Sequence, residues 1–174
     1  MGFLAFSGAI TGMPAQADAR VAQEQPTYSV AMTGYNAVPG QTDEDPFTTA
    51  SGAFSNPEVV AARSRDLADK LPFGTIIEID GPASAQKNCG FDVVSGVIGY
   101  RVIADSMNKR FTDRVDVLFP NGSSKHNPAV VFGVCKDVTI RVVGHVDLKN
   151  PANLPKSQSA LAALVYSSGG LALK

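Results

Sequence analysis

The chain has 174 residues, 44% of them hydrophobic, which suits one ordinary globular core and leaves little room for a second domain. Its 15 Lys and Arg against 16 Asp and Glu give a formal net charge of -1, so no general attraction to nucleic acid or an anionic membrane is indicated. The 16 Gly, the 11 Pro and several β-branched runs favour strands joined by turns, and therefore a mainly β fold.

The N-terminal segment has the pattern of an export signal. The apolar run from Phe3 to Met13 has the length of a signal-peptide hydrophobic region, and Ala17 or Ala19 suits a cleavage site. We expect residues 1–19 to be a signal peptide and the protein to reach the periplasm, the cell wall or the extracellular space. A buried or disordered N-terminal segment is the alternative, because no Lys or Arg precedes the run. The run is too short for stable membrane insertion.

A strand and a long loop follow. Residues 27–36 alternate between apolar and polar and predict a strand. Residues 37–57 show no period, and a loop of this length is either functional or disordered. Its acids, residues 43–45, are expected to be solvated, because the other ligands of a calcium loop are missing.

Residues 56–71 are ambiguous. Asn56 suits a helix N-cap and Pro57 the first helical position, which predicts a helix ending before Pro72. Alternatively, residues 59–62 form a short buried strand that precedes a single helical turn.

The second half of the chain contains four further β-branched, alternating stretches, separated by turn-rich segments. We expect strands at residues 75–80, 91–104, 114–119 and 137–146. His145 lies in the last of these and is expected to be a half-exposed strand residue rather than a catalytic base.

No cofactor or metal site is indicated. The chain has no P-loop or dinucleotide fingerprint, and its two cysteines and two histidines lack the spacing of metal ligands. Cys89 and Cys135 form either one structural disulfide or two buried thiols, and both interpretations stay open.

Two aspartates carry the candidate chemistry. Asp105 ends one predicted strand, and Asp116 lies inside another between two valines. If the second strand is covered on both faces, Asp116 is partly buried and its ionised form is disfavoured, as in a general acid. In the structural alternative, Asp105 caps a turn and Asp116 pairs with Arg110 or Arg114 at the surface.

An ordered set of motifs surrounds these aspartates. The motifs are MTGYN (32–36), TTASG (48–52), VVAA (59–62), LPFGT (71–75), YRVIADSMN (100–108), RVDVLF (114–119), VFG (131–133) and VTIRVV (138–143). Their order resembles the three-aspartate (3D) domain family of bacterial cell-wall proteins, which is related to the catalytic domain of membrane-bound lytic transglycosylase A. The resemblance implies a mainly β fold: a six-stranded double-psi β-barrel with short helices and a C-terminal helical segment. It places the barrel at residues 26–148 and a C-terminal extension at 149–174. Within that extension, a helix-like run at 154–170 ends at two glycines and is expected to pack on the barrel or a partner.

The resemblance also implies roles for the aspartates. Asp116 would be the general acid and base of a peptidoglycan lytic transglycosylase that releases a 1,6-anhydro product, and Asp105 its supporting carboxylate. Asp66 would be the first of the three aspartates, with Asp69 as the alternative register. A glycoside hydrolase that uses Asp105 and Asp116 together is the other enzymatic hypothesis.

The same resemblance implies a substrate groove lined by Tyr35, Thr49 and Ser51, with Asn108 and Arg110 as further substrate-binding residues. Segment 106–113 departs from the family, which often has a glycine-rich stretch there, and it adds bulk and charge.

Four cations, Arg101, Lys109, Arg110 and Arg114, are candidates to contact the lactyl or peptide carboxylates of peptidoglycan. Taken singly, each is better explained as a solvated charge at a strand edge. The leading hypothesis is therefore an exported enzyme that cleaves peptidoglycan, without nucleic acid as a partner. A non-catalytic glycan-binding barrel and a structural surface domain are the alternatives.

Overall fold

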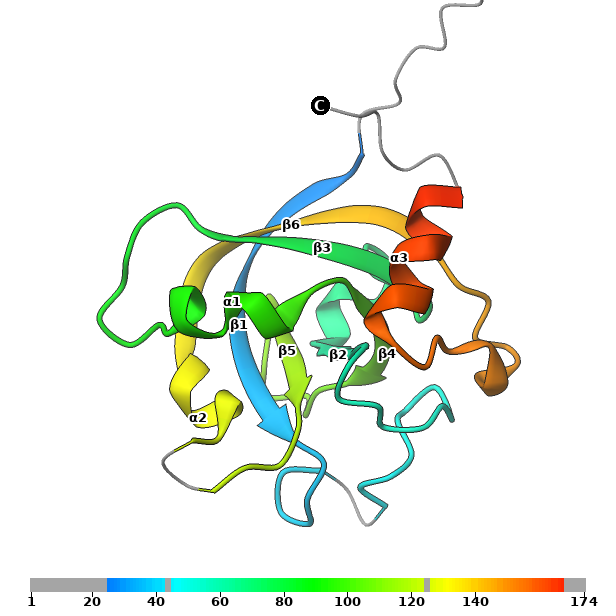
Figure 1. Ribbon diagram of the computed structural model, residues 1–174, viewed down its shortest axis with the longest axis horizontal. Helices are drawn as coiled ribbons and strands as arrows, with labels where there is room; N and C mark the ends of the chain where they lie inside the picture. Colours follow the sequence, from blue (N-terminus) through cyan, green and yellow to red (C-terminus); the bar gives the residue numbers. More distant parts are fainter. Residues whose placement is uncertain (1–24, 43–44, 124–125, 168–174) are drawn as a thin grey trace, which may run out of the picture.

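Six strands close into one barrel in the order β1-β5-β2-β4-β3-β6 (Figure 1). The computed structural model describes residues 25–42, 45–123 and 126–167. The strands are β1 (Thr27–Asn36), β2 (Val60–Arg63), β3 (Thr75–Pro82), β4 (Arg101–Ser106), β5 (Arg114–Phe119) and β6 (Val134–His145). The predicted mainly β fold with a six-stranded barrel is confirmed.

The strand order has an internal two-fold symmetry. β1 pairs with β5, and β2 with β4, in parallel, while the other four neighbouring pairs are antiparallel. Exchanging β1, β2 and β3 for β4, β5 and β6 leaves both the order and the direction of every pair unchanged. The two halves of the chain are thus interlocked, because each half contributes strands that lie between those of the other. This topology is compatible with a double-psi barrel.

The central strands are covered on both faces. Neighbouring residues of β2, Val60 and Ala61, are both buried but belong to two different apolar clusters. Val117 and Leu118 of β5 divide between the same two clusters. Because successive side chains of a strand point to opposite faces, both faces of β5 meet buried apolar residues.

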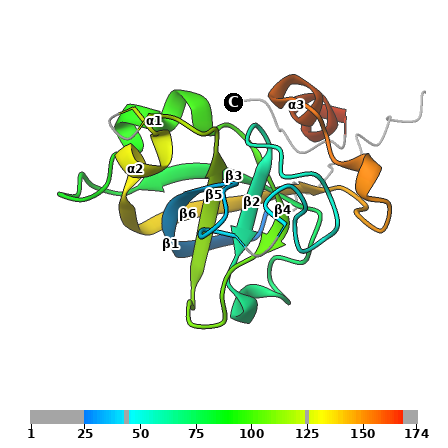
Figure 2. The same cartoon turned by 90° about the horizontal axis from the view of Figure 1, so that it is seen from below.

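In the described part of the chain, three short helices pack around the barrel. α1 (Phe91–Ile98) and α2 (Pro128–Phe132) lie together on one side, and α3 (Gln158–Ser167) lies apart from them (Figure 2). The predicted C-terminal helical run is confirmed as α3, and the glycines expected to end it lie outside the described residues. Two single turns of 3-10 helix complete the fold: η1 (Arg65–Leu67) and η2 (Pro151–Asn153). Within the described ranges, no helix is long and apolar enough to cross a membrane.

The single strand expected at 91–104 is wrong, because its first half is the helix α1. Val94 and Ile98, four residues apart, are buried, whereas Val93 and Val97 are exposed. The helix ends at Gly99, which adopts a positive φ of 58°. Tertiary burial of one helical face therefore overrides the β-branched composition of this segment.

The ambiguity at residues 56–71 is also resolved. Val60–Arg63 form the fully buried strand β2, and Arg65–Leu67 form the single helical turn η1. The short-strand alternative is confirmed and the continuous helix is wrong. Asn56 accepts a hydrogen bond from the Glu58 N–H at 3.0 Å, so it caps a turn rather than a helix.

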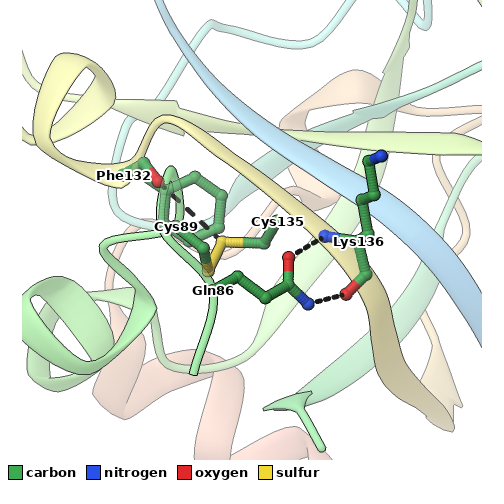
Figure 3. Close-up of a disulfide and its surroundings, with 5 residues drawn as sticks. All are labelled: Gln86, Cys89, Phe132, Cys135 and Lys136. Atoms are coloured by element: carbon green, nitrogen blue, oxygen red, sulfur yellow. Dashed lines mark hydrogen bonds between the residues drawn. A yellow bond between two sulfur atoms is a disulfide. The ribbon is translucent and has the colours of Figure 1, made fainter. Parts of the chain in front are cut away.

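Cys89 and Cys135 form a disulfide with a Cα–Cα distance of 4.7 Å (Figure 3). Beside it, the Gln86 side chain accepts from the Lys136 N–H at 2.9 Å and donates to the Lys136 carbonyl at 2.7 Å. The bond and the amide together fasten the segment before α1 to the beginning of β6.

Candidate active site

A row of register partners crosses four neighbouring strands. Thr33 of β1 is opposite Asp116 of β5, Asp116 is opposite Ala62 of β2, and Ala62 is opposite Asp105 of β4. Register partners share a face of the sheet, so the four side chains lie on the same side. The two carboxylates are therefore separated by one strand, whose residue in this row is a small alanine.

A β-bulge places Asp105 in this row. Ala61 pairs with Ile103, but the next residue, Ala62, pairs with Asp105, so Ala104 is skipped. In a regular ladder Ala104 would occupy the position opposite Ala62, and Asp105 would point to the other face. The extra residue thus turns a carboxylate onto the face that carries Asp116.

Both oxygens of Asp105 accept hydrogen bonds. Oδ1 accepts from the N–H of Ala50 at 2.9 Å and of Ser106 at 2.8 Å, and Oδ2 accepts from the Tyr35 hydroxyl at 3.1 Å. Asp105 therefore holds the turn at residue 50, as the structural alternative expected. Tyr35 is 8% exposed, and burial, followed by the charges of Asp105 and Asp116, raises its pKa well above its ordinary value.

Asp116 is enclosed. Its Oδ1 is buried and has no hydrogen-bond partner among the described residues. Burial raises the pKa of Asp116 to about 6, and the negative charge of Asp105 contributes to the rise. A hydrogen bond from Thr33 and the positive charge of Arg114 act in the opposite direction and lower the pKa.

The expected surface ion pair of Asp116 with Arg110 or Arg114 is wrong. Among the described residues the salt bridges join Arg141 to Glu78 and Asp80. The Arg110 and Arg114 guanidinium groups instead lie over the Phe111 ring, with centroid distances of 4.7 and 5.0 Å.

The two carboxylates line a cavity of about 420 Å³. Its lining residues come from the end of β1, the long loop 37–57, the row of register partners, the start of η1, and the end of β4 with the β4–β5 connection. They are Tyr35, Gly40, Gln41, Thr42, Thr48, Ala50, Ser55, Ala62, Arg65, Asp105, Ser106, Met107, Asn108, Arg110, Phe111 and Asp116. The long loop therefore contributes directly to the cavity wall.

Five of the eight site residues expected from the sequence line this cavity: Tyr35, Asp105, Asn108, Arg110 and Asp116. Asp105, Asp116 and Tyr35 also interact with one another, whereas Asn108 and Arg110 lie on the exposed β4–β5 connection.

Thr49 and Ser51 lie outside the cavity lining and stabilise a turn that contributes to it. Their hydroxyls lie 3.0 Å apart, and the Thr49 hydroxyl also donates to the Ala53 carbonyl at 3.0 Å. These bonds fix the turn whose neighbouring residues, Thr48 and Ala50, line the cavity.

Asp66 lies outside the cavity lining. Its carboxylate accepts from the Asp113 N–H at 2.9 Å, and hydrogen bonds from the Ser64 side chain and this N–H lower its pKa. It therefore ties η1 to the end of the β4–β5 connection. Its neighbour Arg65 does line the cavity.

Arg101, expected as a solvated or substrate-binding cation, is buried with 1% exposure. Its guanidinium donates to the carbonyls of Ile98, Pro57, Leu118 and Val97 at 2.6 to 3.1 Å. Burial lowers its pKa to about 10. Arg101 is thus a structural crosslink, and the interpretation as a strand-edge charge is wrong.

Sequence reasoning missed Thr33, Ala62, Arg65 and Phe111. Thr33 and Ala62 lie within the quoted motifs, but only the strand register puts them beside the aspartates. Arg65 precedes the aspartate chosen from the family pattern, and nothing in its spacing distinguishes it.

No grouping of three or more His, Cys, Asp and Glu side chains that could hold a metal ion occurs in the described part of the chain. No protein-family model and no curated protein sequence matches the chain.

Proposed function

We propose that the protein is an exported lytic transglycosylase that cleaves the glycan strands of peptidoglycan, with Asp116 as its general acid and base. One observation carries the proposal: a half-buried carboxyl with a pKa of about 6, whose Oδ1 is shielded from solvent, lies in a cavity beside a second carboxylate whose two oxygens are both hydrogen-bonded. The ordered motifs that resemble the 3D domain family, and a strand order compatible with a double-psi barrel, support the same proposal.

The chemistry requires one proton-transferring group. Protonated Asp116 donates its proton to the glycosidic oxygen between MurNAc and GlcNAc, and the bond from that oxygen to the anomeric carbon breaks. The resulting carboxylate then removes the proton from the 6-hydroxyl of the same MurNAc, whose oxygen bonds to the anomeric carbon. The product is a 1,6-anhydro sugar, and Asp116 is protonated again. A pKa near 6 suits a group that must both donate and accept a proton.

The state of Asp105 favours this chemistry over hydrolysis. A retaining hydrolase needs its second carboxylate as a nucleophile, and an inverting one needs it as a base for water. Oδ1 of Asp105 accepts from the N–H groups of Ala50 and Ser106, and Oδ2 accepts from the Tyr35 hydroxyl, so three hydrogen bonds fix the orientation of the carboxylate and leave a single acceptor site, on Oδ2. Asp105 is better suited to supply negative charge and hold the turn.

Two arginines suit the acidic parts of peptidoglycan. Arg65 and Arg110 line the same cavity as the carboxylates, and neither belongs to a salt bridge within the described ranges. Guanidinium groups bind carboxylates in a bidentate manner, so these two are placed to contact a lactyl or stem-peptide carboxylate.

A non-catalytic glycan-binding barrel is the second candidate. The bracing role of Asp105 favours it, because a carboxylate that holds the cavity wall needs no chemical role. The two candidates differ in whether a glycosidic bond is broken.

The test is to incubate the purified protein with peptidoglycan sacculi in water enriched in ¹⁸O and to analyse the released fragments by mass spectrometry. A transglycosylase releases 1,6-anhydromuropeptides without ¹⁸O, because the attacking oxygen belongs to the sugar. A hydrolase releases reducing ends that contain one ¹⁸O atom.

Asp116→Asn is expected to abolish the product, while Asp92→Asn, at an exposed position on α1, serves as the matched control. Reducing ends labelled with ¹⁸O would reject the transglycosylase chemistry. Binding to sacculi without any released fragment, by a folded wild-type protein, would support the binding barrel instead.

A further inference from the structure

Strand β1 carries one hydroxyl group beside Asp116 and another beside Asp105. Thr33 and Tyr35 are two residues apart, so their side chains point to the same face of the strand. Thr33 is the register partner of Asp116 on the neighbouring strand, and its side chain acts to lower the pKa of Asp116. Tyr35 donates to Oδ2 of Asp105 at 3.1 Å. Each carboxylate thus has one hydroxyl-bearing residue of β1 beside it.

Under the two-fold symmetry of the barrel, Thr33 is the position equivalent to Asp105. Exchange of the two halves of the strand order brings β1 onto β4 and β5 onto β2. The pair Asp105–Ala62 then corresponds to the pair Thr33–Asp116. Asp116 therefore has Thr33 on one side, and on the other side Ala62 with Asp105 beyond it.

The backbone between the two hydroxyls is held tightly. A Cβ added at Gly34 would lie 2.8 Å from the Phe119 ring and 3.0 Å from Cα of Ala129. Because glycine allows this close approach, β1 packs directly against the end of β5 and α2. The strand therefore has little freedom to move Thr33 away from Asp116.

We propose that Thr33 is a positioning residue for the proton of Asp116: its hydroxyl stabilises the carboxylate that remains after the proton has been donated. Asp105 acts from the far side of Ala62 and favours the protonated form. Thr33 thus favours loss of the proton from Asp116, and Asp105 opposes it. The inference deepens the proposed function, on which its kinetic consequence rests.

Other charged and titratable groups also face Asp116. They are Arg114 on its own strand, Tyr35 on β1, Asp105 on β4, and Arg65 and Arg110 across the cavity. Thr33 differs from all of them because its hydroxyl does not titrate and acts only through hydrogen bonding. A substitution at Thr33 therefore changes the proton affinity of Asp116 without altering the charge of the cavity.

The test is a titration of the Asp116 carboxyl carbon by NMR, with Asp116→Asn used to assign the signal. In Thr33→Val, which keeps the shape and removes the hydroxyl, the Asp116 pKa should rise by about 1. Thr33→Ser should restore the wild-type value. Tyr35→Phe should leave the Asp116 pKa unchanged or lower it, because weaker support of the Asp105 charge reduces the repulsion.

Thr27→Val, at an exposed threonine of the same strand, is the matched control and should have no effect. An unchanged or lowered Asp116 pKa in a folded Thr33→Val would overturn the inference, as would an equal rise in Tyr35→Phe. The titration needs no enzymatic activity, so its result is separate from the fate of the proposed function. If the protein is active, the pH above which Thr33→Val loses its rate should move upward by the same amount.

Discussion

Asp105 and Asp116 are both register partners of Ala62, one from each side, so a single buried alanine separates the two carboxylates. Neighbouring strands lie about 4.8 Å apart, which puts the two aspartate Cα atoms roughly 10 Å from each other. At this spacing their charges interact across a small side chain, and the charge of Asp105 raises the pKa of Asp116. The arrangement depends on one strand register and one bulge.

The enclosure of Asp116 has a cost in stability, which gives the first prediction. Its folded-state pKa of about 6 exceeds the ordinary value of 3.8, so the folded protein binds more protons than the unfolded chain between these values. Stability should therefore fall as pH rises from about 4 to about 6, by up to roughly 3 kcal/mol from this group. Asp116→Asn should be inactive yet more stable than the wild type at pH 7.5.

Urea unfolding at pH 4 and pH 7.5 measures this effect. The advantage of Asp116→Asn should be roughly 1 to 3 kcal/mol at the higher pH and should largely vanish at the lower one. Asp92→Asn, at an exposed helix position, should show no such pH-dependent difference. A less stable Asp116→Asn at pH 7.5 would mean that burial of the carboxyl does not govern its pKa.

The small size of Ala62 gives the second prediction. Its side chain is 3% exposed, lines the cavity and lies between the carboxylates. In Ala62→Val the two added methyl groups occupy cavity space, while a β-branched residue still suits a strand. Glycan turnover, or binding if the protein is a binder, should fall at least about tenfold, and the added volume should cost about 1 kcal/mol of stability.

Ala62→Gly is the counterpart. It should keep glycan turnover or binding while costing up to about 1 kcal/mol, because glycine loses more backbone freedom on folding. Circular dichroism should first show that both variants are folded. Equal losses of glycan turnover or binding in the two variants would then show that filling of the cavity is not the cause of the loss in Ala62→Val.

The arginines on the cavity wall give the third prediction. In Arg110→Gln and Arg65→Gln, binding to peptide-bearing peptidoglycan should weaken about threefold to tenfold at low salt. The loss should shrink in 0.5 M NaCl, because salt screens exposed charges. Lys109→Gln removes the same charge from a neighbouring exposed residue outside the cavity lining and should change binding little. An equal loss in all three variants would indicate a general charge effect.

How much of this fold was predictable depends on which interactions define each element. β1 and β5 begin and end at the predicted residues, because regular alternation and flanking turns are local signals. The segment Phe91–Ile98 is β-branched but helical, because its burial against the core, with Val94 and Ile98 inward, is decided by distant residues. No local pattern contains that information.

Local sequence motifs also predicted part of the candidate site, and the rest depends on the tertiary fold. Asp105 and Asp116 were found from their motifs, yet the burial of Asp116 follows from the coverage of β5 on both faces, which only the closed barrel supplies. The Tyr35–Asp105 hydrogen bond joins residues 70 positions apart, and the bulge at Ala104 leaves no mark in the sequence. Asp66, expected to be the first of the three aspartates, lies outside the cavity lining, and its bond to the backbone of Asp113 depends on the tertiary fold.

The disulfide gives the fourth prediction. Cys89 and Cys135 are separated by 46 positions, and closing a loop of this size reduces the entropy of the unfolded chain by the equivalent of about 4 kcal/mol. Reduction with TCEP, or the double variant Cys89→Ser/Cys135→Ser, should lower Tm by roughly 10 °C. Neither cysteine lines the cavity, so glycan turnover or binding at 25 °C should persist. TCEP should leave the Tm of the double variant unchanged, and an unaltered Tm in reduced wild type would contradict the prediction.

Two glycines with opposite surroundings give the fifth prediction. Gly74 adopts a positive φ of 96°, and a Cβ there would collide with the carbonyl oxygen of Val146 and approach the His145 ring. Its N–H donates to the Ile103 carbonyl at 2.8 Å, and its carbonyl accepts from the Val146 N–H at 2.8 Å, so the backbone cannot move aside cheaply. Gly74→Ala should therefore destabilise the protein by more than about 2 kcal/mol.

Gly96 is the matched comparison, because it lies inside α1 and a Cβ there meets nothing within 4 Å. Alanine loses less backbone entropy than glycine in a helix, so Gly96→Ala should raise the free energy of unfolding by about 0.5 to 1 kcal/mol. Chemical denaturation of both variants tests the pair. Equal and small effects would mean that the constraint at Gly74, which joins β3 to the end of β6, is weaker than its contacts imply.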